Sequence, residues 1–251
     1  MSPLTLTPLP DLPLIQPGDD LAGMILHTLK SSNLELADGD ILVLAQKIVS
    51  KAENRLVDLG TITPSPAALE LAAKTGKDPR LAELILRESN TVLRTRPGTA
   101  IVEHRLGFVC ANAGIDHSNV PGPDTVLLLP EDPDRSAAQL REELESASGK
   151  RLGVMIIDSH GRAWRIGTVG TAIGLSGLPG ALDLRGKPDL FGEALQITIL
   201  GAADELAAAA SLVMGQAAEG RPVVHVRGFP YPLREGSLGE LLRPRDQDMF
   251  R

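Results

Sequence analysis

Two aspartates follow apolar runs in the same way and could hold a metal ion. Asp116 ends the run GFVCANAGID, and Asp158 ends the run GVMIID. Each pattern predicts a carboxylate at the end of a strand. Carboxylate, amide and hydroxyl oxygens are the ligands that Mg²⁺ and Mn²⁺ prefer, so Asp116 and Asp158, with the nearby Asn119 and Ser159, are candidate ligands. Turn capping by each aspartate is the alternative, and the residues alone leave it open.

Histidines beside the two aspartates raise a second possibility, a histidine–carboxylate transition-metal centre. His117 follows Asp116, and His160 lies two positions after Asp158. Neither histidine belongs to an HExxH motif or a similar two-histidine spacing. We therefore expect His117 and His160 to be solvent-facing turn residues.

Basic residues gather in two segments that could bind phosphate. AQKIVSKAENR contains Lys47, Lys51 and Arg55, and HGRAWR contains Arg162 and Arg165. A nucleoside triphosphate carries about four negative charges, so an acidic protein needs a metal ion and a few fixed cations to bind one. Lys51 is the best candidate because it directly follows an apolar run, although most lysines are simply solvated.

No standard nucleotide-binding motif is present. The chain contains neither GxxxxGK[ST] nor a GxGxxG after a strand, so it has no P-loop and no Rossmann motif. The glycine-rich segment IGTVGTAIGLSGLPG could let backbone amides approach an anion, or it could be a series of turns between short strands. A nucleotide would need a less common scaffold.

A mixture of helices and short strands must position these residues. Periodicity predicts helices from Leu21, over 64–90 with a break at 76–79, over 137–147 and over 202–214. Ser136 and Gln139 form a predicted capping box for the third of these. Several neighbouring strands lack an intervening helix, which predicts an α+β, or mixed α/β, fold. The expected strands span 41–49, interrupted by Gln46 and Lys47, and 100–102, 108–111, 126–129, 152–157, 195–200 and 222–226.

The composition is that of a globular protein with no sign of nucleic-acid or membrane partners. Of 251 residues, 43% are hydrophobic and 2% aromatic, so the core must consist mainly of Leu, Ile, Val and Ala. The formal net charge of −7 argues against a general nucleic-acid binder. The N-terminus lacks the pattern of an export signal, and no apolar run approaches the roughly 20 residues of a membrane span. We expect a cytoplasmic protein.

Cys110 is the single cysteine of the chain. An internal disulfide and a cysteine-based zinc site are therefore excluded. Because Cys110 lies in the apolar run GFVCANAG, we expect a buried small residue rather than a catalytic thiol.

Six segments, in order, resemble the coenzyme F420-0:L-glutamate ligase family. They are LPLIQPGDDL, LAQKIVSKAENR, NAGIDHSNV, IIDSHGRAWRIGTVGTAIG, ADELAAAASLVMGQ and VRGF, and they cover nearly the whole chain. The resemblance implies that GTP phosphorylates the terminal carboxylate of F420-0 and that the amine of L-glutamate then displaces phosphate. Repetition would add a second, γ-linked glutamate. A ligase of the same fold with a different carboxylate acceptor is the alternative, and a non-enzymatic nucleotide-binding protein is a third hypothesis.

The resemblance also implies roles for particular residues. The metal ligands would be Asp116, Asp158, Ser159 and Gln216, where Ser159 stands in place of the threonine of many members. The two aspartates would also be the catalytic residues. The implied nucleotide contacts are Leu12, Pro13, Leu14, Ile15, Gln46, Lys51, Asn119, Met214 and Gly215.

Cofactors and organisation follow from the same resemblance. Mg²⁺ or Mn²⁺ would serve the reaction, and K⁺ is a further candidate. Residues 1–251 would form a single ligase unit with two intertwined subdomains whose limits the sequence does not give. We expect a homodimer without a C-terminal nitroreductase-like domain.

Overall fold

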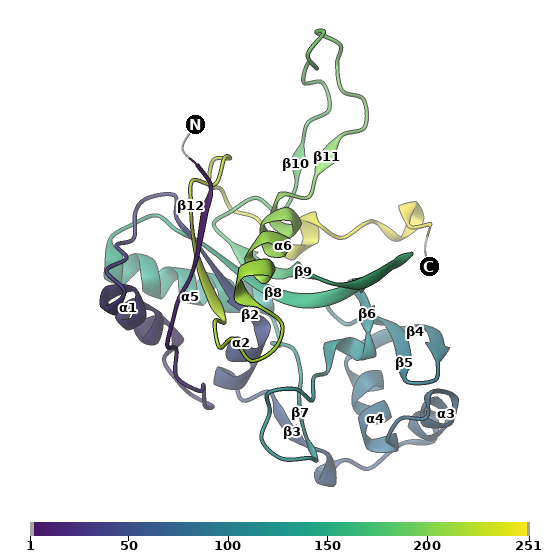
Figure 1. The fold of residues 1–251 in the computed structure, drawn as a ribbon. Helices are drawn as coiled ribbons and strands as arrows, with labels where there is room; N and C mark the ends of the chain where they lie inside the picture. The colour runs from purple at the N-terminus through teal and green to yellow at the C-terminus, as the bar shows by residue number, and fades with distance from the viewer. Residues whose placement is uncertain (1–2, 250–251) are drawn as a thin grey trace.

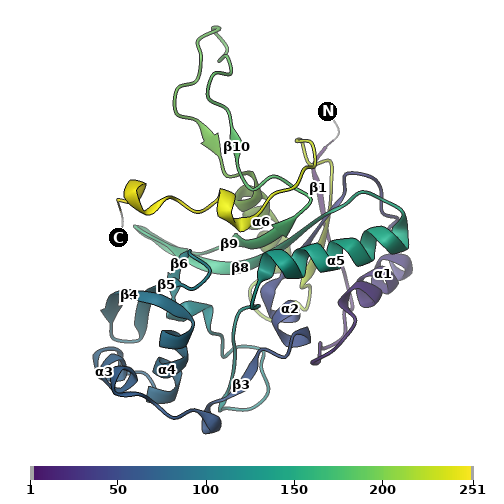
Figure 2. The same cartoon turned by 180° about the vertical axis from the view of Figure 1, so that it is seen from behind.

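A five-stranded mixed sheet with helices on both faces forms the larger part of the computed structural model, which describes residues 3–249 (Figures 1 and 2). The strand order is β1-β12-β2-β8-β9, and only β2 and β8 are parallel neighbours within it. The strands are β1 (Thr5–Pro8), β12 (Val223–Arg227), β2 (Ile41–Ala45), β8 (Gly153–Arg162) and β9 (Arg165–Ser176).

Two apolar cores lie on the opposite faces of this sheet. The helices α1 (Leu21–Ser31) and α5 (Pro133–Ser148) cover one face, and α6 (Ala202–Met214) covers the other. Successive side chains of a strand point to opposite faces, so Leu42 packs in the first core and Val43 in the second. Burial on both faces explains why β2 and the first half of β8 are continuously apolar.

Residues 53–129, which we call the insert lobe, lie between α2 (Gln46–Ala52) and α5 in the sequence and have an apolar core of their own. Helices α3 and α4 pack beside the three-stranded sheet β4-β5-β6, and β3 pairs with β7. The elements are β3 (Leu56–Asp58), η1 (Leu59–Thr61), α3 (Pro66–Thr75), α4 (Pro79–Arg87), β4 (Ser89–Arg96), β5 (Thr99–His104), β6 (Val109–Ala111), η2 (Asn112–Gly114) and β7 (Thr125–Leu127).

A long arm, residues 182–200, projects from the body of the molecule (Figures 1 and 2). Its base is the pair β10 (Leu182–Asp183) and β11 (Ile199–Leu200). Beyond the arm, η3 (Leu238–Glu240) and η4 (Arg245–Gln247) lie in the C-terminal segment. Within residues 3–249, no helix has the length and apolar character needed to cross a membrane.

The predicted α+β fold is confirmed, and so are most of its helices. The helix expected over 202–214 has these bounds in the structure, and the region 64–90 contains two helices separated at the predicted break. The strands β1, β3, β4, β9 and β10 are not among the predicted strands. The strand expected over 195–200 is reduced to Ile199–Leu200.

The strand predicted over 41–49 is wrong in its second half. The chain leaves the sheet after Ala45 and forms α2. Ile48 and Val49 face the first core, whereas Lys47 and Lys51, one helical turn apart, are half-buried. Of the two polar residues that interrupt the predicted strand, Lys47 lies on the outer side of this helix, and Gln46 is buried at its start.

Three other local predictions are wrong. Helix α5 begins at Pro133 with Asp132 as its N-cap, so Ser136 lies inside the helix and forms no capping box. Strand β8 continues past Asp158 to Arg162, so this carboxylate lies within a strand. The glycine-rich segment forms the strand β9 rather than turns or an anion-binding loop, because Gly170 and Gly174 let α6 and the start of α5 pack against its backbone.

Candidate active site

The candidate site lies at the carboxyl edge of the two parallel strands. Ala45, the last residue of β2, pairs with Ile157 of β8. The next residues, Gln46 and Asp158, therefore emerge at the same edge of the sheet. In open sheets, ligands bind outside the carboxyl ends of parallel strands.

Lys47 and Asp116 form an ion pair at this edge. The Nζ atom of Lys47 lies 2.8 Å from Oδ2 of Asp116, and it donates to the hydroxyl of Ser118 at 2.5 Å. The other carboxylate oxygen of Asp116 accepts from the backbone N–H and the hydroxyl of Ser118. Burial acts to raise the pKa of Asp116, but the bonds from Lys47 and Ser118 together hold it below its usual value. Asp116 is therefore an ionised, partly buried carboxylate.

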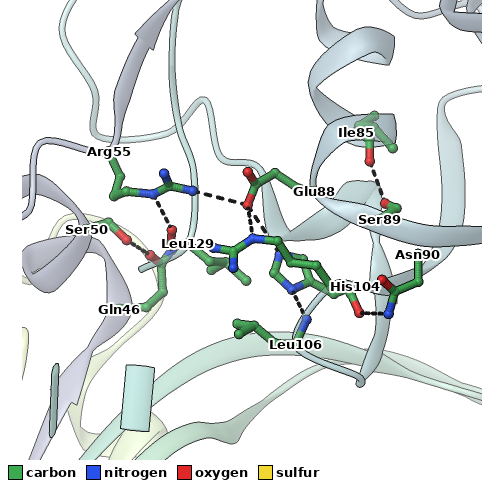
Figure 3. A network of polar contacts seen from close by, with 11 residues as sticks. Gln46, Ser50, Arg55, Ile85, Glu88, Ser89, Asn90, His104, Leu106 and Leu129 are labelled. Atoms are coloured by element: carbon green, nitrogen blue, oxygen red, sulfur yellow. Dashed lines mark hydrogen bonds and ion pairs between the residues drawn. The ribbon is translucent and has the colours of Figure 1, made fainter. Parts of the chain in front are cut away.

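Gln46 and Lys51 supply further polar groups from α2. Gln46 is 1% exposed, and its Oε1 atom accepts from the Ser50 hydroxyl at 2.8 Å (Figure 3). Its Nε2 atom has no partner among the described residues, which leaves a buried donor for a ligand or a water molecule. Burial and the neighbouring Lys47 lower the pKa of Lys51.

Asp158 contacts a histidine on its own strand. His160 Nε2 lies 3.1 Å from Asp158 Oδ2, and the two side chains are 12% and 14% exposed. The prediction that His160 is a solvent-facing turn residue is therefore wrong: residues two apart in a strand share a face, and here that face is covered. His117 is exposed, as predicted.

Ser159 and Gln216 form a second pair on the opposite face of β8. The Ser159 hydroxyl donates to Gln216 Oε1 at 2.8 Å, and Gln216 Nε2 donates to Ser211 at 2.8 Å. Because neighbouring strand residues point to opposite faces, Asp158 and Ser159 do not converge on one point. The four predicted metal ligands thus form no single cluster in the structure: Ser159 pairs with Gln216, Asp158 contacts His160, and Asp116 contacts Lys47 and Ser118.

The donor atoms of these residues fit a hard divalent cation. Carboxylate, amide and hydroxyl oxygens are present, and Asp158 Oδ1 accepts no hydrogen bond from any described residue. Between residues 3 and 249, no group of three His, Cys, Asp or Glu side chains is placed to hold a metal ion. A cation here would therefore rely on few protein ligands and on its substrate, as Mg²⁺ commonly does with phosphates.

The remaining predicted nucleotide contacts lie on loops and helix ends. Leu12 and Pro13 lie in the loop before α1 with Leu14, which is 87% exposed, and Ile15, which is buried in the first core. Asn119 is exposed and has a left-handed backbone with φ 58°. Gly215 ends α6, and Met214 packs in the second core. Ile15 and Met214 can therefore offer a ligand only their backbone.

Sequence reasoning missed the roles of Lys47 and His160 in this arrangement. In the sequence, Lys47 is one of several basic residues with no sign of a carboxylate partner. Its contact with Asp116 depends on a helix where a strand is predicted. An i, i+4 pair of lysines, Lys47 and Lys51, was the available signal. A cavity of about 340 Å³ near α1, α2 and α5 contains acidic residues such as Glu53 and Glu143, and none of the predicted site residues lines it.

Comparisons with known proteins identify the family of this chain. The family model described as F420-0:Gamma-glutamyl ligase matches residues 11–228. Proteins named coenzyme F420:L-glutamate ligase are similar along almost their whole length. The one from Methanothermobacter thermautotrophicus is 50% identical over 96% of both chains, and that from Methanopyrus kandleri is 48% identical over 99% of this chain and 98% of its own. The chain is therefore a ligase that belongs to the F420-0:gamma-glutamyl ligase family.

Proposed function

We propose that this enzyme joins L-glutamate to coenzyme F420-0 in a GTP-dependent reaction at the carboxyl edge of β2 and β8. The names of the similar proteins supply the acceptor and the amino acid. One observation carries the assignment of the site: Lys47 of α2 forms an ion pair with Asp116 at the edge where Asp158 emerges. Fixed cations beside carboxylates are what a site for a metal–nucleotide complex requires.

The reaction proceeds in two steps. The terminal carboxylate of F420-0 first attacks the γ-phosphorus of GTP, the bond from that phosphorus to the β–γ bridging oxygen breaks, and GDP leaves. The amine of L-glutamate then attacks the carbonyl carbon of the acyl phosphate, the bond from carbon to the phosphate oxygen breaks, and phosphate leaves. The amine loses its proton to water. A second cycle on the new terminal glutamate gives a γ-linked product.

The basic residues of α2 orient the nucleotide and balance its charge. Lys47 and Lys51 present two ammonium groups one helical turn apart, and Gln46 presents an unpaired amide donor beside them. Asn119 and the backbone of Leu12, Pro13, Leu14, Ile15, Met214 and Gly215 complete the proposed nucleotide contacts.

When bound, Mg²⁺ or Mn²⁺ would neutralise the charge that develops on the phosphoryl oxygens, and K⁺ is a further proposed cofactor. Asp116 and Asp158 are its proposed ligands. Ser159 and Gln216, which lie across β8 from the Asp158 side chain, are proposed ligands of a separate cation. Lys47 contacts Oδ2 of Asp116 in this structure and so shares the carboxylate with a bound cation.

We also propose that the protein is a homodimer. Leu190, Phe191 and Ile197 on the arm are 100%, 92% and 87% exposed. Exposed apolar side chains on a projecting segment are typical of a surface that another protein covers. A second copy of the chain is the partner that the family resemblance implies.

Product analysis tests the proposed reaction. Mass spectrometry after incubation with F420-0, GTP, L-glutamate and Mn²⁺ should show a deazaflavin heavier by one or more glutamyl residues. Omission of GTP or of L-glutamate should abolish this product. GTP hydrolysis without a glutamylated product, or product formation without GTP, would contradict the proposal.

A further inference from the structure

A stack of three aromatic rings leads from the insert lobe to Asp158. His104, the last residue of β5, stacks on Phe108 with ring centroids 5.0 Å apart and an interplanar angle of 3°. The Phe108 ring lies 5.2 Å from that of His160 at an angle of 44°. His160 in turn contacts Asp158 at 3.1 Å. The insert lobe and the candidate site on β8 are thus connected through side chains in direct contact.

The first ring of the stack is held firmly by the insert lobe. His104 is fully buried, and its Nδ1 atom accepts the backbone N–H of Leu106 at 3.1 Å (Figure 3). Burial lowers the pKa of His104 to about 3, so the ring is neutral and carries its proton on Nε2. That atom faces Glu88 Oε2 at 3.7 Å, and Arg55 and Arg105 in turn hold Glu88 with bonds of 3.2 and 3.0 Å.

The position of the second ring is fixed by a tight turn and by packing. The backbone N–H of His104 donates to the carbonyl of Phe108, and that of Gly107 donates to the carbonyl of His104, both at 2.8 Å. Gly107 has φ +98°, a conformation that favours glycine. Phe108 packs against the core of the insert lobe and against the first core of the sheet. The ring therefore has little freedom to move away from His160.

We propose that Phe108 is a positioning residue: it holds His160 against Asp158 Oδ2 so that Oδ1 is presented to the divalent cation. This inference rests on the proposed role of Asp158 as a metal ligand. Residues behind a ligand fix its orientation, and their loss typically costs about 10–100-fold in metal affinity or activity. Phe108 needs no contact with the cation for this effect.

Mn²⁺ binding to the intact protein, followed by the electron paramagnetic resonance signal of free Mn²⁺, tests the proposal. Phe108→Leu removes the ring and should weaken Mn²⁺ binding about tenfold. Phe108→Tyr keeps the ring and should stay within about twofold of the unchanged protein. Phe229→Leu is the matched control because Phe229 is also half-buried but packs against the second core. Saturating Mn²⁺ should restore the turnover of Phe108→Leu.

The outcomes separate this inference from the proposed function. If Asp158→Asn weakens Mn²⁺ binding and Phe108→Leu does not, the positioning role is wrong and the metal assignment stands. If Asp158→Asn leaves Mn²⁺ binding unchanged, Asp158 is not a ligand, and both the metal assignment of Asp158 and the positioning role of Phe108 are wrong. Equal weakening by Phe108→Leu and Phe108→Tyr, or by Phe108→Leu and Phe229→Leu, would also overturn the positioning role.

Discussion

Lys47 Nζ lies 2.8 Å from Asp116 Oδ2, and this contact joins the helix that follows β2 to the segment that follows η2 in the insert lobe. Both side chains are 26% exposed, so solvent screens the pair only in part. The ion pair keeps Asp116 ionised and holds a cation at the place where the proposed reaction needs one.

Replacing Lys47 tests whether this cation serves the reaction. Lys47→Gln should lower turnover roughly 100-fold, because a positive charge near the phosphoryl group is lost. Lys47→Arg keeps the charge and should retain more activity than Lys47→Gln. Steady-state rates of glutamyl transfer at saturating GTP measure the effect, and equal rates for Lys47→Gln and the unchanged protein would exclude a catalytic role.

Removing either carboxylate charge should impair metal-dependent turnover. Asp116→Asn and Asp158→Asn each replace a charged oxygen ligand by a neutral one, and we expect a loss of 100-fold or more, on the order found for electrostatic groups at active sites. Circular dichroism should show folded protein in both cases. Asp246→Asn, at an exposed position of the C-terminal segment, is the control. Unchanged rates in both active-site variants would remove the metal assignment.

Cys110 should resist alkylation in the folded protein. Its side chain is buried, and burial, followed by the charge of Asp158, raises the pKa of the thiol to about 12. At pH 8 the thiolate fraction is then about 10⁻⁴, compared with about 0.2 for an ordinary cysteine. Mass spectrometry with iodoacetamide should show modification only after unfolding in urea. Rapid modification of the native protein would contradict the placement of this residue.

Acid should lower the free energy of unfolding by protonating Asp40, the residue just before β2. Burial acts to raise the pKa of Asp40, but the bonds from Arg227, His225 and the backbone of Ala37 hold it below its usual value. Since the folded-state pKa is the lower one, this stabilisation is present above about pH 4 and is lost as the pH falls through the folded-state value.

The variant Asp40→Asn measures this contribution. At pH 7 it should reduce the free energy of unfolding by about 3 kcal/mol, because a buried carboxylate that bonds to Arg227 and His225 is lost. Urea titrations between pH 7 and pH 3 should show that the difference from the unchanged protein shrinks on acidification. A difference that stays constant with pH would show that Asp40 does not titrate in this way.

Two glycines of the same β8–β9 ribbon should respond differently to a methyl group. A Cβ atom at Gly170 would overlap the backbone carbonyl of Ala207 in α6, whereas nothing lies within 4 Å of one at Gly161. Gly170→Ala should therefore lower the free energy of unfolding by about 1–3 kcal/mol. Gly161→Ala should have little effect in the same urea titration. Equal stability of the two variants would contradict the close packing of α6 on β9.

Sequence alone predicted the fold class and most of the helices, because these depend on local signals. The stripe beginning at Leu21 and the alanine-rich run 202–214 bury one side at helical spacing, whatever they pack against. The segment 41–49 was predicted wrongly because Ile48 and Val49 suit a strand and a short helix equally well. Only their packing against the first core decides between the two.

The sequence also predicted the residue types of the candidate site, but not which of these residues contact one another. Asp116, Asp158, Ser159 and Gln216 could all be chosen as oxygen ligands from type and resemblance. The tertiary structure separated Asp158 from Ser159 onto opposite faces of β8, paired Ser159 with Gln216, and brought Lys47 to Asp116. These contacts join residues distant in the chain, and they depend on how β8 continues past Asp158 and on where the insert lobe packs, which no local pattern encodes.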